Sequence, residues 1–238
     1  MEDFKNILFL DIETVASTEH YADLSDRMKV QWARKVNFFR QREEGQTDES
    51  LFYERAGIYA EFGKIIVIAI GKFTENEKGE RSLKTKYFVN HDERILLEEF
   101  KTALDKMDSA NLKLCAHNGK EFDFPYLSRR MLVHSIPLPS VLNLAGKKSW
   151  DIPHLDTMEL WKFGDYKHYT SLDLLAALFD IPTSKGDLDG SKVNHVYYSE
   201  KNLIKIAEYC VGDVVAVAQL FLKLKGLDLI TEVNIVHS

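Results

Sequence analysis

The 238-residue chain lacks the features that mark several specialised classes of protein. It has only two cysteines, Cys115 and Cys210, both in apolar segments and without metal-ligand spacing, which argues against a disulfide framework or a structural zinc site. It has no low-complexity tract and no run of like charges. No stretch reaches the roughly 18 to 20 apolar residues of a membrane span, and the charged start MEDFKN lacks the apolar region of a signal peptide. We therefore expect a soluble, cytoplasmic protein with no membrane partner and with reduced core thiols.

The overall composition is that of an ordinary globular protein, with 45% hydrophobic and 29% charged residues. The length is at the upper end for one domain, so we expect a single domain over residues 1–238. The net charge of −6 argues against a protein that coats nucleic acid over its whole surface. It leaves room for a local basic groove, because electrostatic attraction depends on where the charges lie.

The hydrophobic pattern predicts an α/β domain built on one mixed sheet. Strands are expected at 6–12, 64–73, 84–89 and 112–117, and helices at 93–107, 122–133, 170–180 and 199–227. Thr170 or Ser171 is expected to cap one of these helices, and Ser199 to cap the last. The alternation of strands and helices after the first three strands is typical of this class.

The segment 16–63 separates the first two strands and is too long for a structureless loop, so we expect a helical insertion. Within it, residues 27–42 contain six basic residues, no acidic one, and three aromatic residues. Two interpretations stay open. The aromatic residues Trp32, Phe38 and Phe39 could stack on the bases of a bound strand, or they could pack against the domain while the charges are solvated.

Three acidic motifs carry the functional signal. Asp11 and Glu13 end the first strand and point to the same face, because side chains alternate along a strand. Asp123 follows the fourth strand and opens a helix. Tyr209 and Asp213 are four residues apart and therefore share one face of the last helix. Each motif alone is weak evidence for a functional site, since acids at the end of a strand can simply be solvated and the start of a helix favours an acid. The alternative to these structural explanations is that the acids bind a cation.

Taken together, the motifs resemble those of 3′–5′ exonucleases with four conserved acids and a tyrosine in the third motif (the DEDDy type). The likeness is to the proofreading exonuclease domain of B-family DNA polymerases. The matching residues are Asp11 and Glu13 in the first motif, Asn118, Phe122 and Asp123 in the second, and Tyr209 and Asp213 in the third. The resemblance implies a ribonuclease H-like fold with a central mixed five-stranded sheet flanked by helices. Because the chain ends 25 residues after Asp213, we expect the free-standing bacterial form without a polymerase domain.

The resemblance also implies two divalent cations, Mg²⁺ or Mn²⁺, as cofactors. Two such ions can position a nucleophile, neutralise the phosphate and stabilise the leaving oxygen, and hard cations prefer carboxylate ligands. Asp11 would bridge both ions, Glu13 and Asp213 would hold the ion that carries the attacking water, and Asp123 would hold the second. Tyr209 would orient that water by a hydrogen bond. By the same resemblance, Ile12 and Thr14 line the pocket for the terminal nucleotide, and Asn118 and Phe122 contact the penultimate one.

The sequence therefore predicts a metal-dependent enzyme that releases nucleoside 5′-monophosphates from single-stranded 3′ ends, with DNA as the expected substrate. Two alternatives stay open: an exoribonuclease that trims RNA 3′ ends, and a catalytically inactive nucleic-acid-binding module. His117 is expected to be a structural residue, with a metal-ligand or base role as its alternative. We expect a monomer or weak oligomer, and the sequence names no protein partner.

Overall fold

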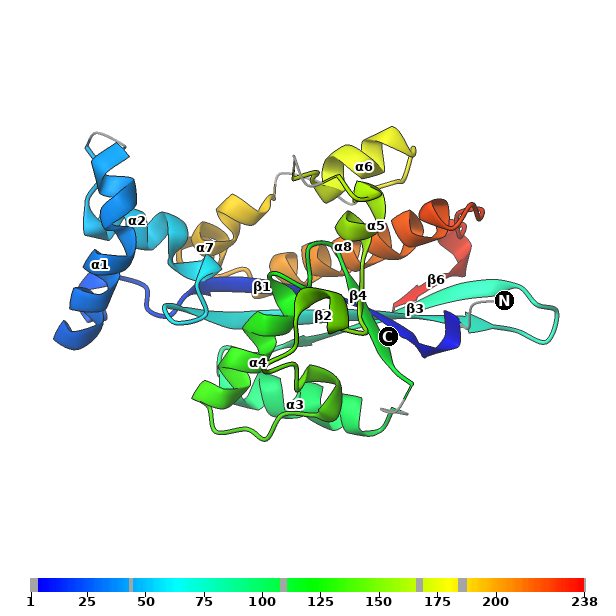
Figure 1. Ribbon diagram of the computed structural model, residues 1–238, viewed down its shortest axis with the longest axis horizontal. Coiled ribbons are helices and arrows are strands. Elements are labelled where there is room, and N and C mark those ends of the chain that lie inside the picture. The colour runs from blue at the N-terminus through cyan, green and yellow to red at the C-terminus, as the bar shows by residue number, and fades with distance from the viewer. Residues whose placement is uncertain (1–3, 43–44, 108–110, 166–168, 184–187, 238) are drawn as a thin grey trace.

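A six-stranded mixed sheet runs through the protein, with helices on both faces (Figure 1). The structure is a computed structural model, which describes residues 4–42, 45–107, 111–165, 169–183 and 188–237. The strands are β1 (Ile7–Ala16), β2 (Gly63–Glu75), β3 (Arg81–Val89), β4 (Lys113–Ala116), β5 (Leu155–Asp156) and β6 (Ile235–His237). The helices are α1 (Asp26–Arg42), α2 (Asp48–Arg55), α3 (Glu93–Asp105), α4 (Asp123–Val133), α5 (Thr157–Lys162), α6 (Leu172–Leu178), α7 (Val193–His195) and α8 (Leu203–Leu224).

The strand order is β5-β4-β1-β2-β3-β6. Strands β1, β2 and β3 form an antiparallel meander, whereas β4, β5 and β6 each run parallel to the neighbour they join. The predicted mixed sheet is confirmed, but the expected number of five strands is one too low among the described residues. The edge strands β5 and β6 have two and three residues, too few for an alternating pattern to reveal them in the sequence.

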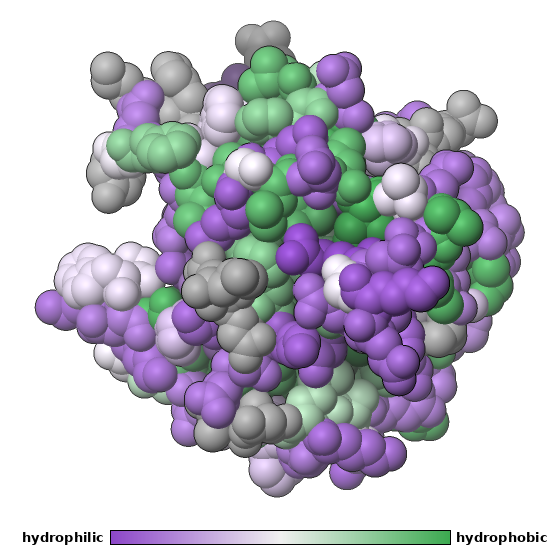
Figure 2. Space-filling view, turned by 90° about the vertical axis from the view of Figure 1, so that its right-hand side faces the viewer, coloured by the Kyte–Doolittle hydropathy of each residue, from purple (hydrophilic) through white to green (hydrophobic). Residues whose placement is uncertain are grey.

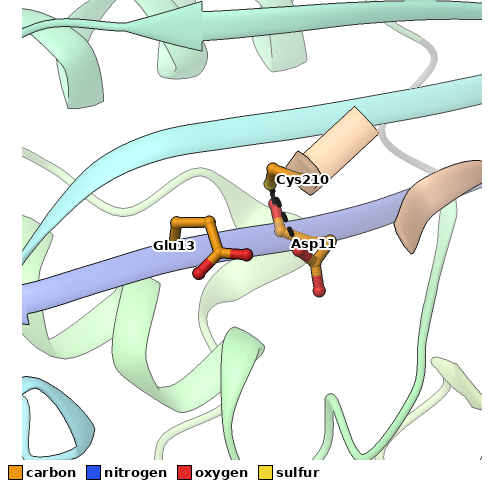
Figure 3. Close-up of side chains that lie close together, drawn as sticks. All are labelled: Asp11, Glu13 and Cys210. Carbon is orange, nitrogen blue, oxygen red and sulfur yellow. Dashed lines mark hydrogen bonds between the residues drawn. The ribbon is translucent and has the colours of Figure 1, made fainter. Parts of the chain in front are cut away.

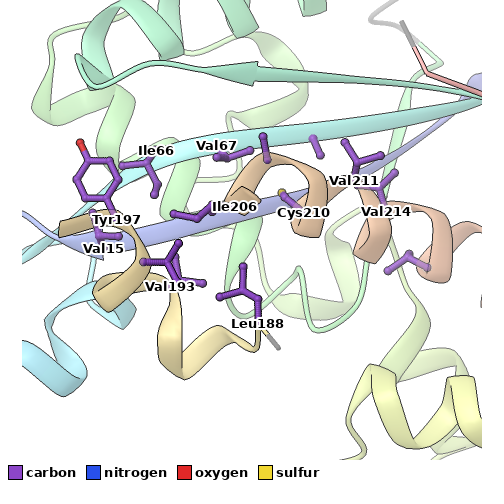
Figure 4. Close-up of a cluster of buried hydrophobic side chains, with 14 of the residues drawn as sticks. Val15, Ile66, Val67, Leu188, Val193, Tyr197, Ile206, Cys210, Val211 and Val214 are labelled. Atoms are coloured by element: carbon purple, nitrogen blue, oxygen red, sulfur yellow. The ribbon is translucent and has the colours of Figure 1, made fainter. Parts of the chain in front are cut away.

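The two faces of β1 pack against different helices. Ile7, Phe9 and Val15 belong to the core under α8, whereas Leu8 and Leu10 belong to the core under α3 and α4. Figure 4 shows part of the first core, where side chains of α8 meet those of β1 and β2. The strict alternation means that the odd-numbered residues of β1, including the two acids, face α8.

One edge of β1 is only partly covered. β1 pairs with β4 through Ile7, Leu8 and Phe9, and β4 ends at Ala116 while β1 continues to Ala16. On the other side, β1 pairs with β2 along its length, with a register shift between Glu13 and Thr14. Bulges of this kind increase local twist and commonly re-aim side chains beside functional sites. The sheet therefore leaves an open edge along the second half of β1.

The expected helical insertion is present. Helices α1 and α2 and the single turn Ala56–Ile58 occupy one end of the sheet (Figure 1). Trp32 is fully buried, packs edge-on against Phe52 and Phe62, and donates its indole N–H to the main-chain oxygen of Asp48 at 2.8 Å. The base-stacking interpretation is therefore wrong for Trp32, which holds the insertion together. Phe38, by contrast, is 52% exposed.

The last helix starts later than expected. α8 begins at Leu203 and is capped by the side chain of Asn202, which accepts from the N–H of Lys205 at 3.1 Å. Ser199 lies instead in a π-helical turn, Val196–Glu200, that ends in a left-handed residue, Lys201. The apolar pattern predicts one continuous helix from 199, but the left-handed conformation of Lys201 interrupts it, so α8 begins only at Leu203. The cap at Ser171 is confirmed, since its hydroxyl accepts from the N–H of Leu174.

The end of the molecule away from α1 and α2 carries polar side chains that surround smaller apolar areas (Figure 2). Part of the acidic, glycine-containing stretch 184–193 lies outside the described residues.

Among the helices that the structure describes, none combines the length and the apolar character needed to cross a membrane.

The packing of the insertion leads to a stability prediction. Trp32→Ala should lower the free energy of unfolding by roughly 3–5 kcal/mol, because it opens a large cavity and leaves the Asp48 carbonyl without its donor. Phe38→Ala, on the same helix, should change it by no more than about 0.5 kcal/mol, because the ring is exposed. Denaturant unfolding of the two variants measures the difference, and equal losses would contradict the assignment.

Candidate active site

Two carboxylates and a thiol meet between β1 and α8 (Figure 3). Carboxylate oxygens of Asp11 and Glu13 and the sulfur of Cys210 lie within 4.8 Å of one another. The Cys210 thiol donates to the Asp11 carboxylate at 3.2 Å and to its main-chain oxygen at 3.4 Å. The acids come together because they are two apart on one strand, and the thiol joins them because α8 packs across that face of the sheet.

Asp123 reaches the same place from the open edge of β1. It is the first residue of α4 and is only 3% exposed. Its carboxylate accepts a hydrogen bond from the main-chain N–H of Ile12 at 3.2 Å. Within the described part of the chain, the β1–β4 ladder stops at Phe9, so no strand residue there pairs with this part of the edge on the β4 side. Asp123 therefore supplies an acceptor to a strand N–H and is held beside Asp11 by that bond.

The remaining motif lies on α8. Tyr209 and Asp213 are one helical turn apart, and burial, followed by the charge of the Asp213 carboxylate, raises the pKa of the Tyr209 phenol. Asp213 also acts electrostatically on both Asp11 and Glu13. The structure thus brings together all four acids and the tyrosine that the sequence singled out, from β1, α4 and α8.

Burial and the neighbouring carboxylates raise the pKa values of the acids. Burial, followed by repulsion from neighbouring carboxylates, raises the pKa of Asp11 and of Glu13 well above their usual range. Burial raises the pKa of Asp123 to about 7, although hydrogen bonds from two main-chain N–H groups work against this. Burial also raises the pKa of the Cys210 thiol and of the Tyr209 phenol. Both donors are therefore neutral at physiological pH.

A cavity of about 420 Å³ opens beside the acids. Seven of the nine predicted site residues line it: Asp11, Ile12, Glu13, Thr14, Asn118, Phe122 and Asp123. Tyr209 and Asp213 lie outside this lining and approach the acids from α8. Other parts of the wall come from the insertion, from residues 190–194 and from Tyr169.

Asn118 is held in an unusual conformation at the cavity. Its φ is +64°, and its main-chain N–H donates to the Asp156 carboxylate at 2.9 Å. The other oxygen of Asp156 accepts from the N–H of Lys120 at 3.1 Å, so this buried acid fixes the turn after β4. The side-chain oxygen of Asn118 is buried without a hydrogen-bond partner among the described residues. Such an orphaned acceptor at a cavity is available to a ligand.

His117 is a structural residue in this fold. One ring nitrogen is 2.9 Å from the Thr157 hydroxyl and the other is 2.8 Å from the main-chain oxygen of Thr170. Burial lowers the pKa of His117, so the ring is neutral. With both nitrogens occupied, the ring fastens the end of β4 to the start of α5 and to the segment before α6.

Sequence reasoning missed three contributors to the site. Asp156 is signalled only by its position before the short helix α5, where its side chain accepts from Met158 N–H. Cys210 was expected as an inert core thiol, and its bond to Asp11 depends on how α8 packs. The wall residues of the insertion, such as Tyr53, have no sequence signal at all, because their role depends on long-range packing.

The comparison with protein families supplies the decisive observation. Residues 58–232, more than half of the chain, match a family described as a predicted 3′-5′ exonuclease related to the exonuclease domain of PolB. The chain belongs to this family. The predicted resemblance is thereby confirmed, although the match begins after β1 and most of the insertion. A comparison with curated proteins finds none that matches.

A solved structure supports the same fold. The protein is similar to the family B DNA polymerase from the hyperthermophilic archaeon Pyrobaculum calidifontis, with a TM-score of 0.55 and 16% sequence identity. The alignment covers 92% of this chain and 24% of the polymerase, so the chain spans about a quarter of that protein's length. At this identity the likeness shows the fold alone, which is the ribonuclease H-like fold of the polymerase exonuclease domain.

The donor set of the acidic cluster fits hard divalent cations. The charged groups that act on Asp11 are the carboxylates of Asp123, Glu13 and Asp213. Carboxylate oxygens are the ligands that Mg²⁺ and Mn²⁺ prefer, and a bound cation would offset the mutual repulsion. The neutral Cys210 thiol donates its hydrogen to Asp11 and is therefore suited to orienting that ligand rather than to binding the ion.

The raised pKa values predict how stability depends on pH in EDTA. Asp11, Glu13 and Asp123 have higher pKa values in the folded state than their ordinary unfolded values near 4. Between those values the folded state binds more protons, so stability should fall as pH rises from about 5 to 8. In a domain of this size each 1 kcal/mol corresponds to roughly 2–4 °C in Tm.

Thermal melts of three proteins test this expectation. Asp11→Asn should melt higher than the wild type at pH 8 in EDTA, because it removes one of the repelling charges, whereas the exposed-acid control Glu99→Gln on α3 should not. Mn²⁺ should raise the wild-type Tm more at pH 8 than at pH 5. A wild-type Tm in EDTA that does not fall with pH relative to Asp11→Asn would contradict the assignment.

Proposed function

We propose that the protein is a 3′–5′ exonuclease that hydrolyses phosphodiester bonds at the 3′ end of single-stranded nucleic acid, with DNA as the preferred substrate. The products are nucleoside 5′-monophosphates. The observation that carries the proposal is the convergence of the acids of β1, α4 and α8 beside one cavity, in a chain of an exonuclease-related family.

In this proposal Asp11, Glu13, Asp123 and Asp213 hold two divalent cations, Mg²⁺ or Mn²⁺. When bound, such ions activate water and stabilise the charge that develops on the phosphate and the leaving oxygen. The chain itself fixes the acids. The N–H of Ile12 orients Asp123 and the thiol of Cys210 orients Asp11, while Tyr209 lies one helical turn from Asp213 on α8.

Tyr209 acts as a hydrogen-bonding group in this proposal. Its pKa is raised, first by burial and then by the charges of Asp213, Glu13 and Asp11, so the phenol keeps its proton. A neutral phenol can accept from and donate to a water molecule beside Asp213. It therefore aligns the attacking water and does not remove its proton.

The substrate-binding residues are assigned by their places on the cavity. Ile12 and Thr14 lie on β1 next to the acids, where they would contact the terminal nucleotide. Asn118 and Phe122 line the cavity between β4 and α4, where they would contact the penultimate nucleotide. Asn118 and Phe122 both belong to the second motif, which supports placing them together on the substrate.

The central test is cleavage of a 5′-labelled single-stranded oligonucleotide. With Mg²⁺ or Mn²⁺ the wild type should produce a ladder that EDTA abolishes. Asp11→Ala should reduce the rate by roughly 10³-fold or more, equivalent to about 4 kcal/mol of transition-state stabilisation. The control Glu99→Ala, an exposed acid on α3, should cleave like the wild type. Absence of a ladder, or a ladder that persists in Asp11→Ala, would refute the proposal.

A second test concerns Tyr209. Tyr209→Phe keeps the ring in its half-buried position but removes the hydroxyl that would align the attacking water. We expect kcat to fall by roughly 10²-fold with little change in KM, as when one preorganised donor is removed from an active site. Mn²⁺ affinity, measured by calorimetry, should stay within about threefold of the wild type. A rise in KM with kcat unchanged would assign Tyr209 to substrate binding instead.

Two alternative functions give different results in the same assays. An exoribonuclease would degrade RNA faster than DNA of the same sequence, so parallel substrates separate it from the proposed enzyme. An inactive binding module would bind the oligonucleotide without cleaving it and would show no Mn²⁺ binding that depends on Asp11 and Asp213. The intact cluster of acids favours the active enzyme.

A further inference from the structure

Part of the cavity wall is made by the insertion. Tyr53 and Glu54 at the end of α2, and Gly57 and Ile58 in the following turn, line this wall. Tyr53 is 42% exposed and Ile58 is 52% exposed. Single exposed apolar residues are common on protein surfaces, but these two come from one segment and line one cavity.

Hydrogen bonds fix this wall to the site. The main-chain oxygen of Gly57 accepts from the hydroxyl of Thr14 at 2.7 Å and from the hydroxyl of Tyr126 at 2.8 Å. A side chain at Gly57 would lie 3.2 Å from the main-chain oxygen of Thr14, so the turn packs closely on β1. The wall is therefore contiguous with Thr14 and preorganised before any ligand binds.

A second set of bonds fixes the α2 part of the wall. The side chain of Asn194 donates to the main-chain oxygen of Tyr53 at 3.1 Å and accepts from the N–H of Ala16 at 3.0 Å. The Tyr53 hydroxyl lies 3.3 Å from a ring nitrogen of His195. Residues on β1, α2 and α7 thus hold the ring of Tyr53 at the edge of the cavity.

The chemistry of the cavity is divided in two. Its floor carries the carboxylates, which suit cations and, through them, a phosphate group. The wall offers an aromatic ring and a branched aliphatic side chain, which suit the flat apolar face of a ring. A nucleotide combines both requirements in one molecule, and a volume of about 420 Å³ lies within the range of small-molecule sites.

We propose that Tyr53 and Ile58 form a binding surface for the base of the 3′-terminal nucleotide. The inference rests on the proposed function and extends it, by assigning a substrate-recognition role to the insertion. The terminal base is the occupant because the wall adjoins Thr14 through Gly57. Stacking and apolar contact tolerate every base, so the surface recognises the presence of a base and not its identity.

Binding to ends with and without a terminal base tests the inference. The ligands are two fluorescent single-stranded oligonucleotides that differ only in whether the 3′-terminal residue carries its base or is abasic. Anisotropy titrations are run with Ca²⁺ in place of Mg²⁺, and intact oligonucleotide is checked afterwards. The wild type should bind the base-bearing end roughly 5- to 100-fold more tightly, the range expected for one stacked base. The double variant Tyr53→Ala, Ile58→Ala should lose most of this ratio.

Matched variants make the result specific. Tyr87→Ala, Ile95→Ala removes a tyrosine and an isoleucine of similar exposure, 39% and 44%, from β3 and α3, and should keep the wild-type ratio. Tyr53→Phe should also keep it, because the ring remains when the hydroxyl near His195 is lost. Thermal melts of each variant establish that it is folded.

The outcomes separate the two proposals. If the ratio is the same in the wild type and in the Tyr53, Ile58 double variant, the base-binding wall is overturned, while cleavage in the ladder assay leaves the nuclease function standing. A wild type with no preference for the base-bearing end also overturns it. If the ratio falls as expected but no cleavage occurs with Mg²⁺ or Mn²⁺, the hydrolytic function fails and the wall stands.

Discussion

Mutual repulsion among closely spaced carboxylates, of which Glu13 and Asp123 are buried, is the constraint that the rest of this structure has to accommodate. Asp11, Glu13, Asp123 and Asp213 act on one another across β1, α4 and α8. Two of them accept a hydrogen bond from a neutral donor: a strand N–H for Asp123 and a thiol for Asp11. Neutral donors orient the acids without cancelling their charge, so the cluster keeps its attraction for cations.

Another buried acid in the same domain, Glu93, is paired with a cationic side chain, unlike the acids of the cluster. Glu93 is 5% exposed and forms a two-pronged bond with the Arg130 guanidinium, at 2.9 and 2.5 Å, while its carboxylate also accepts from the N–H of Ile65. This acid has its own cation and holds α3, α4 and β2 together. Proteins bury acids with such partners as a rule. The cluster of Asp11, Glu13, Asp123 and Asp213 departs from that rule, and this departure points to an external cation.

The parts of the site that the sequence predicted are those set by local geometry. Alternation along β1 places Asp11 and Glu13 on one face, and helical spacing places Tyr209 beside Asp213. The family resemblance joined these local pairs. The role of Asp156 in fixing Asn118, and the burial of Trp32, depend on contacts between residues far apart in the chain. The spacing of residues in the sequence does not reveal such long-range contacts. The sequence therefore left two interpretations of the aromatic segment 27–42, and the packing shows that Trp32 is a buried structural residue.

The insertion helps to cover the exposed edge of β1. An uncovered strand edge exposes unpaired main-chain groups, and proteins cover or cap such edges. On β1 the edge beyond Phe9 is capped by Asp123, and the end of the strand is covered by the turn at Gly57 and by Asn194. The acids on this edge must keep their positions if they are to share cations. The insertion covers the end of this edge and also presents side chains to the cavity, Tyr53 and Ile58 among them. Part of the substrate recognition in this chain is therefore expected to lie in the connecting segment, in addition to the residues of β1 and of the turn before α4, because loops on rigid scaffolds commonly carry binding residues.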